Sequence, residues 1–257
     1  MQPNTHPDAR QDTRATTPAT TLRWASRALT RLWPARCRIC QSWPCQTLCD
    51  PCVATFGQAP ARCPRCAERL PAAAPVSLCT DCRQQPPPQA WTLAWGDYGY
   101  PWSFLLGRLK FGDDVGLARA LGRLLAQTPG LAARLDAVDL IVALPLSPQR
   151  LARRGYNQSQ LLAAALAAHL PPAHRRKLRP GLLDKPRHTP AQHELPRAQR
   201  LANVRHAYRV RDAQAVDGRR VLLVDDVMTT GATLQSAART LLAAGAREVG
   251  ALVLARA

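Results

Sequence analysis

Residues 221–234, VLLVDDVMTTGATL, decide the fold class of this 257-residue chain. Residues 221–224 are a short run of β-branched and aliphatic side chains, which is typical of a strand buried on both faces of a parallel sheet. The Ala-rich segment 232–244 behind it has the composition of a helix. A buried strand that leads through a short turn into a helix predicts an α/β fold, and such sheets bind ligands beyond the carboxyl ends of their strands.

Two carboxylates and a hydroxyl-rich turn separate this strand from this helix. Asp225 and Asp226 can accept hydrogen bonds from a diol. The turn offers hydroxyl groups, a glycine that permits close backbone approach, and the first N–H groups of a helix to an anion. An Asp-Asp pair before a threonine cap is common in α/β proteins, but the complete order of residues is far more restrictive. It predicts a site for a sugar 5′-phosphate and its ring hydroxyls, whereas Walker and dinucleotide fingerprints are absent from the sequence.

The rest of the C-terminal region alternates in the same way. Strands are predicted at residues 91–100, 140–144, 221–224 and 249–254, with helices at 102–111, 117–127, 157–170 and 232–244. The aliphatic run at 140–144 is interpreted as a central strand. Strands that alternate with helices of ten or more residues predict a doubly wound parallel sheet.

Nine cysteines indicate a metal module, because the chain shows no export signal that would favour disulfides. Eight of them form four C-x-x-C pairs within 46 residues, each able to present two thiolates to a tetrahedral zinc ion. The pairs are Cys37 and Cys40, Cys49 and Cys52, Cys63 and Cys66, and Cys79 and Cys82. They predict one or two structural zinc ions, with sequential or crossed pairing left open, and Cys45 is left over. A redox role for one pair is the alternative. Four thiolates leave no coordination position for water, so metal catalysis is not expected.

Composition divides the chain into four parts. Residues 1–30 are expected to be a disordered or helical extension, 31–83 a zinc-binding module of the four-cysteine type, 84–90 a proline-rich linker, and 91–257 the α/β domain. A short basic helix at 22–33 is expected to pack on the zinc module, although a membrane-surface helix or transit peptide would have a similar pattern. No apolar run is long enough for a membrane span. The expected location is cytoplasmic.

Positive charge is concentrated in one region. The formal net charge is +18, and residues 145–211 contain fourteen Arg and Lys against two acidic residues, a net charge of +12. Such a concentration favours an anionic partner. A pyrophosphate-bearing small molecule and a nucleic-acid backbone both fit, and a solvated arginine-rich surface is the third interpretation.

Several ordered motifs together resemble the ComF family, phosphoribosyltransferase-like proteins associated with competence for DNA uptake. They are the four C-x-x-C pairs, LKFGDD at 109–114, RGYNQ at 154–158, the polar segment 189–203, and LLVDDVMTTGAT at 222–233. The resemblance covers about residues 37–257. It implies an N-terminal zinc module followed by a type I phosphoribosyltransferase domain.

The resemblance also implies roles for individual residues. Asp225 and Asp226 would contact the ribose hydroxyls, and the turn of Thr229, Thr230, Gly231, Ala232 and Thr233 would hold the 5′-phosphate. A pyrophosphate loop would involve Leu146, Ser147 and Arg150, with Arg154 beside it. Arg197 and Arg200 would lie on a loop that closes over the pyrophosphate, with Mg²⁺ bridging substrate oxygens. With the two aspartates, these arginines are the predicted catalytic residues.

The acceptor is not identified by this pattern. Relatives that use 6-oxopurines carry an acidic residue where this chain has Thr229, so no base-activating carboxylate is visible. Lys185 or His188 could move a proton, but both are interpreted as surface residues.

Two other functions are compatible with the sequence. The chain could be an accessory protein that grips single-stranded DNA with its zinc module and basic face and has a non-catalytic phosphoribosyl site; its aromatic content of 5% offers few stacking platforms. It could also assemble with a DNA-uptake helicase. The pattern does not predict the oligomeric state.

Overall fold

The computed structural model describes residues 35–57, 60–71, 77–112, 114–186 and 207–257. The predicted N-terminal extension with its basic helix, Arg197, Arg200 and His188 lie outside the described residues. No helix in the described part of the chain is long and apolar enough to cross a membrane.

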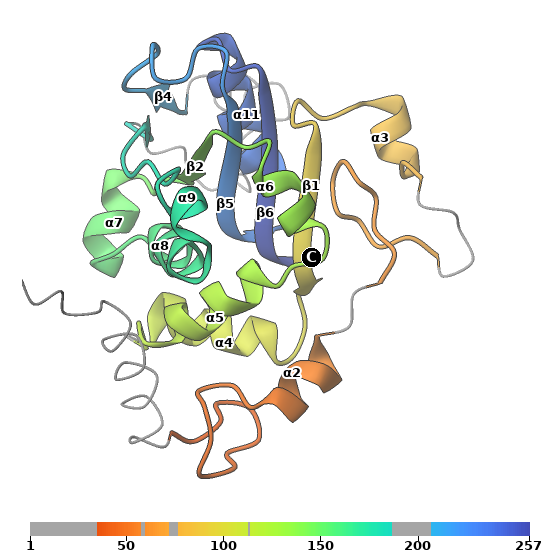
Figure 1. Cartoon of the computed structure of the whole chain (residues 1–257), viewed down its shortest axis with the longest axis vertical. Coiled ribbons are helices and arrows are strands. Elements are labelled where there is room, and N and C mark those ends of the chain that lie inside the picture. The colour runs from red at the N-terminus through yellow and green to blue at the C-terminus, as the bar shows by residue number, and fades with distance from the viewer. Residues whose placement is uncertain (1–34, 58–59, 72–76, 113, 187–206) are drawn as a thin grey trace, which may run out of the picture.

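The centre of the molecule is a four-stranded parallel sheet in the order β1-β6-β5-β2 (Figure 1). The strands span Trp91–Asp97 (β1), Leu140–Ala143 (β2), Arg220–Met228 (β5) and Glu248–Arg256 (β6). In register, Val224 lies between Ala143 of β2 and Leu252 of β6. The predicted parallel α/β sheet is therefore confirmed, although β5 continues through both aspartates instead of ending before them.

Strand β2 lies at one end of the sheet, so its interpretation as a central strand was wrong. Its four residues are all buried, because a neighbouring segment covers the outer edge. The Ile141 N–H donates to the carbonyl of Lys177 at 2.8 Å, and the Ile141 carbonyl accepts from Arg179 N–H at 2.9 Å. A run of four buried residues does not show whether a strand lies in the centre or at the edge of a sheet, because a covered edge is as apolar as the interior.

Helices cover both faces of the sheet, as a doubly wound fold requires. On one face, Leu222 and Val224 of β5 belong to a core shared with the helices α4 (Trp102–Phe111), α5 (Leu117–Ala126) and α8 (Gln158–His169). On the other, Val221 and Leu223 pack with α11 (Ala232–Ala243). Fully burying a side chain of this size stabilises the fold by roughly 2 kcal/mol. The remaining elements of the domain are short: α6 (Leu131–Leu135), α7 (Pro148–Arg154), α9 (Pro172–Arg175), β3 (Leu183–Asp184) and β4 (Arg209–Val210).

Helix α8 shows how local sequence sets these elements. Its first N–H groups are capped by Asn157, whose Oδ1 accepts from Ser159 N at 3.0 Å and Gln160 N at 3.4 Å. It ends before Pro171, which has no N–H to donate. Close packing against α5 requires Gly122, because a Cβ there would lie 2.4 Å from the Cβ of Ala165.

The cysteine-rich region forms two separate knuckles that dock on different sides of the domain (Figure 1). The first knuckle, residues 35–57 with helix α2 (Asp50–Phe56), packs on α4, where Trp102 Nε1 donates to the Phe56 carbonyl at 3.1 Å. The second knuckle, residues 60–71 and 77–85 with α3 (Thr80–Gln84), lies along β1, where Thr92 Oγ1 donates to the Arg65 carbonyl at 2.7 Å. Gln89 of the predicted proline-rich linker is fully buried.

Candidate functional site

A cavity of about 190 Å³ opens beyond the carboxyl ends of β2 and β5. It brings together residues that five separate segments of the sequence contribute. Its walls include Lys110, Leu146, Ser147, Arg150, Arg154, Gln158, Ser159, Lys185, Tyr208, Asp225, Asp226 and Thr233. The acidic pair, the predicted pyrophosphate segment and the start of α11 thus share one cavity, as an α/β sheet predicts.

Asp225 lies buried at the base of this cavity, with 8% of its surface exposed. One carboxylate oxygen accepts from Ser159 Oγ at 2.7 Å and from the Asp226 N–H at 2.9 Å. Burial, and then the charge of Asp226, raise the pKa of Asp225 to about 7 in spite of these hydrogen bonds and the Lys110 ammonium. A carboxyl group held in such an environment costs stability, which favours a functional role.

Asp226 forms an ion pair with a lysine that α4 contributes to the cavity wall. Lys110 Nζ lies 2.6 Å from Asp226 Oδ2, and the side chains are 19% and 6% exposed. The other oxygen, Oδ1, accepts from the Val227 N–H at 2.8 Å. Lys110 comes from the C-terminal turn of α4, within the LKFGDD run.

The RGYNQS stretch links three of the elements around the cavity. Tyr156 donates its hydroxyl to the Leu109 carbonyl at the end of α4, and Asn157 Nδ2 donates to the Leu144 carbonyl after β2 at 2.9 Å. Ser159 reaches β5 through Asp225, and Arg154 donates to the side chain of Gln158. This stretch therefore holds the cavity walls together.

Three cations face the cavity from the side of α7 and the β3–β4 pair: Arg150, Arg154 and Lys185. The guanidinium of Arg154 stacks 5.1 Å from the centre of the Phe111 ring. Lys185 was interpreted as a surface residue, but it lines the cavity, with its Nζ 5.0 Å from the centre of the Tyr208 ring. Burial, followed by the charge of Arg150, lowers the pKa of Lys185.

Tyr208 places a buried hydroxyl in the same wall. The residue is 6% exposed, and its hydroxyl has no hydrogen-bond partner among the described residues. A buried polar group without a partner costs about 1–3 kcal/mol. An oxygen of a bound ligand would satisfy it.

The predicted phosphate turn lies only partly in the cavity. Thr233 lines the cavity, whereas Thr229 and Thr230 are exposed in the turn that leads to it. Gly231 begins α11 with φ +76°, and a Cβ there would meet the Met228 methyl at 2.5 Å. Gly231 has no side chain to cap this helix, and among the described residues Thr230 Oγ1 accepts a long hydrogen bond of 3.4 Å from the Ala232 N–H. The positive end of a 12-residue helix therefore remains available to an anion.

The predicted pyrophosphate segment is the beginning of α7 and not an open turn. Ser147 is buried and caps the helix by accepting from Arg150 N at 3.5 Å. Pro148 occupies the first helical turn, where its missing N–H is tolerated. Leu146 and Arg150 line the cavity on either side of this cap.

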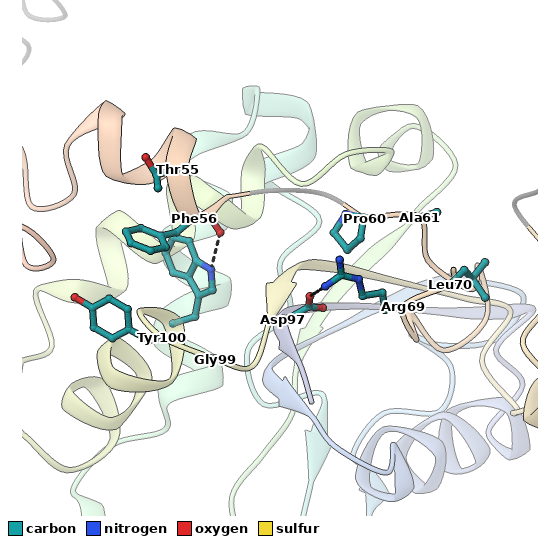
Figure 2. A pocket seen from close by; sticks show the side chains of 10 residues that line it. Thr55, Phe56, Pro60, Ala61, Arg69, Leu70, Asp97, Gly99 and Tyr100 are labelled. Carbon is teal, nitrogen blue, oxygen red and sulfur yellow. Dashed lines mark hydrogen bonds and ion pairs between the residues drawn. The ribbon is translucent and has the colours of Figure 1, made fainter. Parts of the chain in front are cut away.

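A second cavity of about 490 Å³ lies between the two knuckles and the end of β1 (Figure 2). Phe56 and Tyr100 meet edge to face there, with ring centres 5.7 Å apart. Its carboxylate, Asp97, is already paired with Arg62 at 2.6 Å and Arg69 at 3.4 Å. This larger cavity has no pair of adjacent carboxylates facing several cations, so the smaller cavity is the candidate sugar-phosphate site.

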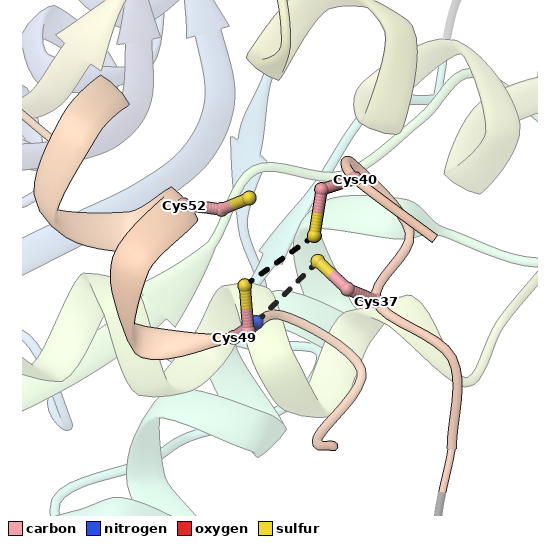
Figure 3. Close-up of side chains that lie close together, drawn as sticks. All are labelled: Cys37, Cys40, Cys49 and Cys52. Carbon is pink, nitrogen blue, oxygen red and sulfur yellow. Dashed lines mark hydrogen bonds between the residues drawn. The ribbon is translucent and has the colours of Figure 1, made fainter. Parts of the chain in front are cut away.

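The eight paired cysteines form two compact groups, and their pairing is sequential. Cys37, Cys40, Cys49 and Cys52 make the first, shown in Figure 3, and Cys63, Cys66, Cys79 and Cys82 make the second. Within each group all sulfurs lie within 4.8 Å of one another. Backbone N–H groups also point at sulfur, as from Cys49 to Cys37 Sγ at 3.5 Å and from Cys79 to Cys63 Sγ at 3.4 Å. Each group could hold one tetrahedral zinc ion.

The thiols of the first group have unequal affinities for protons. The Ser42 hydroxyl lowers the pKa of Cys40 to about 6, because it can donate a hydrogen bond to the thiolate, whereas burial raises the pKa of Cys52. A divalent cation would let all four ionise together. Cys45 lies outside the group, with its thiol donating to the carbonyls of Ser42 at 3.1 Å and Gln46 at 3.0 Å.

Comparison with known proteins agrees with this geometry. Residues 157–257 match the phosphoribosyl transferase domain family. DNA utilization protein YhgH of Salmonella typhimurium is 38% identical over 212 residues, which are 81% of this chain and 90% of that protein. Competence protein F of Haemophilus influenzae is 33% identical over 183 residues, or 70% of this chain and 78% of its own. The chain belongs to the ComF family. A further ComF relative, competence protein ComFC of Bacillus subtilis, is 31% identical and covers 59% of this chain and 58% of its own length.

Three residues that line the candidate site were not predicted from the sequence: Lys110, Ser159 and Tyr208. Lys110 lies inside the LKFGDD motif, and Ser159 directly follows the RGYNQ motif. Lys110 could have been singled out, because it stands at the end of an apolar helix next to a Gly-Asp-Asp turn. Nothing local distinguishes Tyr208, because its burial depends on packing against distant strands.

Proposed function

We propose that this ComF-family protein binds phosphoribosyl pyrophosphate with Mg²⁺ and transfers the phosphoribosyl group to a base, in a role connected with DNA uptake. One observation carries the proposal: the buried Asp225 and Asp226 form the base of a cavity whose other wall is cationic. A ribose diol and a pyrophosphate place hydroxyl donors and negative charge at opposite ends of one small molecule, which matches this arrangement. The names of the relatives, DNA utilization protein and competence protein, support the connection with DNA.

Each part of the substrate has a matching group in this proposal. The two carboxylates accept hydrogen bonds from the ribose 2′ and 3′ hydroxyls. Thr233 and the N-terminus of α11 take the 5′-phosphate. Arg150, Arg154 and Lys185 face the pyrophosphate, and Tyr208 donates its unpaired hydroxyl to the same group. Arg197 and Arg200, outside the described residues, stay predicted as residues of a closing loop.

The reaction has a simple charge balance. Breaking the bond between C1 of the ribose and the pyrophosphate oxygen leaves positive charge on the ring and negative charge on the leaving group. The carboxylates stabilise the ring, and the fixed cations stabilise the pyrophosphate. Mg²⁺ would supply further neutralisation of the phosphate oxygens. We infer that substrate oxygens hold this ion, since Lys110 and Ser159 already engage the two carboxylates.

Calorimetric titration with phosphoribosyl pyrophosphate and Mg²⁺ tests the sugar site. The double variant Asp225→Asn/Asp226→Asn is expected to bind at least about 100-fold more weakly, since hydrogen bonds to charged groups contribute about 1.5–3 kcal/mol each. Asp136→Asn is the matched control, because that carboxylate is 88% exposed and remote from the cavity. Equal affinity of the wild type and the double variant would remove the assignment.

Catalysis is separated from binding by a nucleobase screen that measures pyrophosphate release. Release with one class of base, lost in the double variant, is expected for a transferase. Tight binding without release for any base would favour the alternative, an accessory protein of DNA uptake with a non-catalytic phosphoribosyl site.

A further inference from the structure

The tightest charged contact of the site joins two residues that are 116 positions apart in the sequence, Lys110 and Asp226. The low exposure of both side chains, 19% and 6%, distinguishes it from the surface ion pairs of the domain. Asp184, for example, pairs with Arg209 and Arg211, whose side chains are 65% and 61% exposed. Surface pairs of that kind contribute little, whereas water screens the Lys110–Asp226 pair less, because both side chains are largely buried.

The chain fixes the end of α4 from two sides. The carbonyl of Leu109 accepts the Tyr156 hydroxyl, and Asp114, just beyond the helix, pairs with Arg38 of the first knuckle at 3.3 Å and Arg108 at 3.4 Å. Lys110 lies between these two attachments. Its ammonium group is therefore directed at the acidic pair by the packing of α4, the first knuckle and the segment before α8.

The acidic pair needs such a partner. Two adjacent buried carboxylates repel one another, and Asp225 already has its pKa raised by burial and by the charge of Asp226. The groups that face the pair are Lys110 from α4, Ser159 from α8, Arg150 and Arg154 from α7, Lys185 and Tyr208 beside β3 and β4, and Thr233 from α11. Among the described cationic groups, Lys110 alone makes direct contact with a carboxylate of the pair.

We propose that Lys110 is a positioning residue of the ribose site, whose ammonium group fixes the Asp226 carboxylate and favours the ionised form of Asp225, so that the pair can accept hydrogen bonds from the two ring hydroxyls. This inference rests on the proposed function for the identity of the sugar. The effect of Lys110 on the carboxylates does not depend on any ligand. The two claims can therefore be tested separately.

The first test needs no ligand. In protein labelled with ¹³C at aspartate carboxyl groups, the titration midpoint of Asp225 is followed by NMR in wild type, Lys110→Gln and Lys110→Arg. Loss of the ammonium group is expected to move this midpoint up by about one pH unit, since a nearby opposite charge lowers a carboxyl pKa by about 1–3 units. Lys110→Arg keeps the charge and is expected to restore most of the shift. Arg119→Gln, which removes one charge from an exposed position of α5 outside the cavity lining, controls for general electrostatics.

The second test measures affinity for phosphoribosyl pyrophosphate and Mg²⁺ between pH 6 and 9. Lys110→Gln is expected to bind about 10-fold more weakly near pH 7, with the deficit shrinking as the pH rises and Asp225 ionises without the ammonium group. A purely structural ion pair would give a deficit that is the same at every pH.

The outcomes of the two tests differ. Wild-type protein that binds no phosphoribosyl pyrophosphate at any pH would contradict the proposed function, while a shifted Asp225 midpoint in Lys110→Gln would still support the electrostatic role. Wild-type protein that binds, together with a Lys110→Gln variant of unchanged midpoint and unchanged affinity profile, would overturn the inference. A Lys110→Arg variant that titrates like Lys110→Gln would also count against it.

Discussion

At the scale of single residues, the site is built from groups that the fold holds at a cost. Asp225 is a buried carboxyl group whose neighbours include another carboxylate, and its pKa lies at about 7 instead of the ordinary value of 3.8. Tyr208 keeps a buried hydroxyl without a partner among the described residues. Both features are typical of sites in which a ligand completes the interactions.

The raised pKa of Asp225 gives a prediction about stability. A group whose pKa is higher in the folded state contributes stability below its unfolded value, and this contribution is lost as the pH rises through the folded value. Ionised Asp225 therefore destabilises the wild type above about pH 7. Asp225→Asn, neutral at every pH, is expected to increase the free energy of unfolding at pH 8 by roughly 2 kcal/mol.

Urea unfolding of both proteins at pH 8 and pH 5 checks this expectation. The gain is expected to shrink at pH 5, where Asp225 of the wild type is protonated in the folded state. Asp212→Asn, a change at an exposed position where the amide oxygen can still accept from the Ala215 N–H, should leave stability nearly unchanged at both pH values. A variant Asp225→Asn that is less stable than the wild type by the same amount at both would contradict it.

Sequence patterns predicted those residues of the candidate site that lie close together in one segment. They did not predict the residues that packing brings to the site from other segments. Asp225, Asp226 and Thr233 stand within one short segment, so their relation to a strand and a helix can be inferred directly. Lys110 and Ser159 meet the aspartates only because α4 and α8 pack on the same face of the sheet. No local pattern encodes that convergence.

At the scale of elements, the two knuckles are the clearest case of a partial prediction. The C-x-x-C spacing predicted all eight paired sulfurs, because two residues between cysteines let both thiolates reach one ion. It left the pairing open, since sulfurs of any two pairs could share an ion equally well. The pairing follows from the fold, in which each knuckle brings its own two C-x-x-C pairs together.

Metal analysis tests the two knuckles. We expect about two zinc ions per chain by mass spectrometry of natively purified protein, and about one for Cys37→Ser/Cys40→Ser, because the groups are independent. Cys45→Ser is the matched control and should retain both ions, since its sulfur lies outside the first group. A strong chelator should lower the thermal stability of the wild type.

The structural-zinc interpretation would be wrong if natively purified protein contained no zinc. A count that fell for Cys45→Ser as much as for the double variant would instead contradict the assignment of the ligands.

At the scale of the whole molecule, the knuckles are attached to the α/β domain through specific polar contacts. Arg256, in the last strand, donates to the Cys66 carbonyl at 3.1 Å and pairs with Glu68 at 2.5 Å. Arg123 of α5 holds Asp50 of the first knuckle at 3.0 Å. Sequence composition placed a linker between the two regions, but it could not show that both knuckles lie against the domain.

Removing the Arg256 contacts should loosen the second knuckle. Arg256→Met keeps the aliphatic stem and is expected to lower the free energy of unfolding by about 1–2 kcal/mol, because the Cys66 carbonyl and Glu68 lose their donor. The ion pair itself adds little, since Glu68 is 48% exposed. Limited proteolysis followed by mass spectrometry should show faster cleavage within residues 60–85.

Arg247→Met, at an exposed position just before β6, is the control for loss of charge. Equal stability and equal cleavage rates for the two variants would show that Arg256 does not secure the knuckle.

The cavity depends on the unequal lengths of β2 and β5. Ala143, the last residue of β2, is level with Val224, while β5 runs on to Met228. The last ladder hydrogen bond on this side runs from the Leu144 N–H to the Val224 carbonyl at 3.0 Å, so Asp225 and Asp226 have no partner residue in register on β2. A β2 longer by two or three residues would bring backbone into register with the two aspartates, so the cavity depends on one strand stopping early.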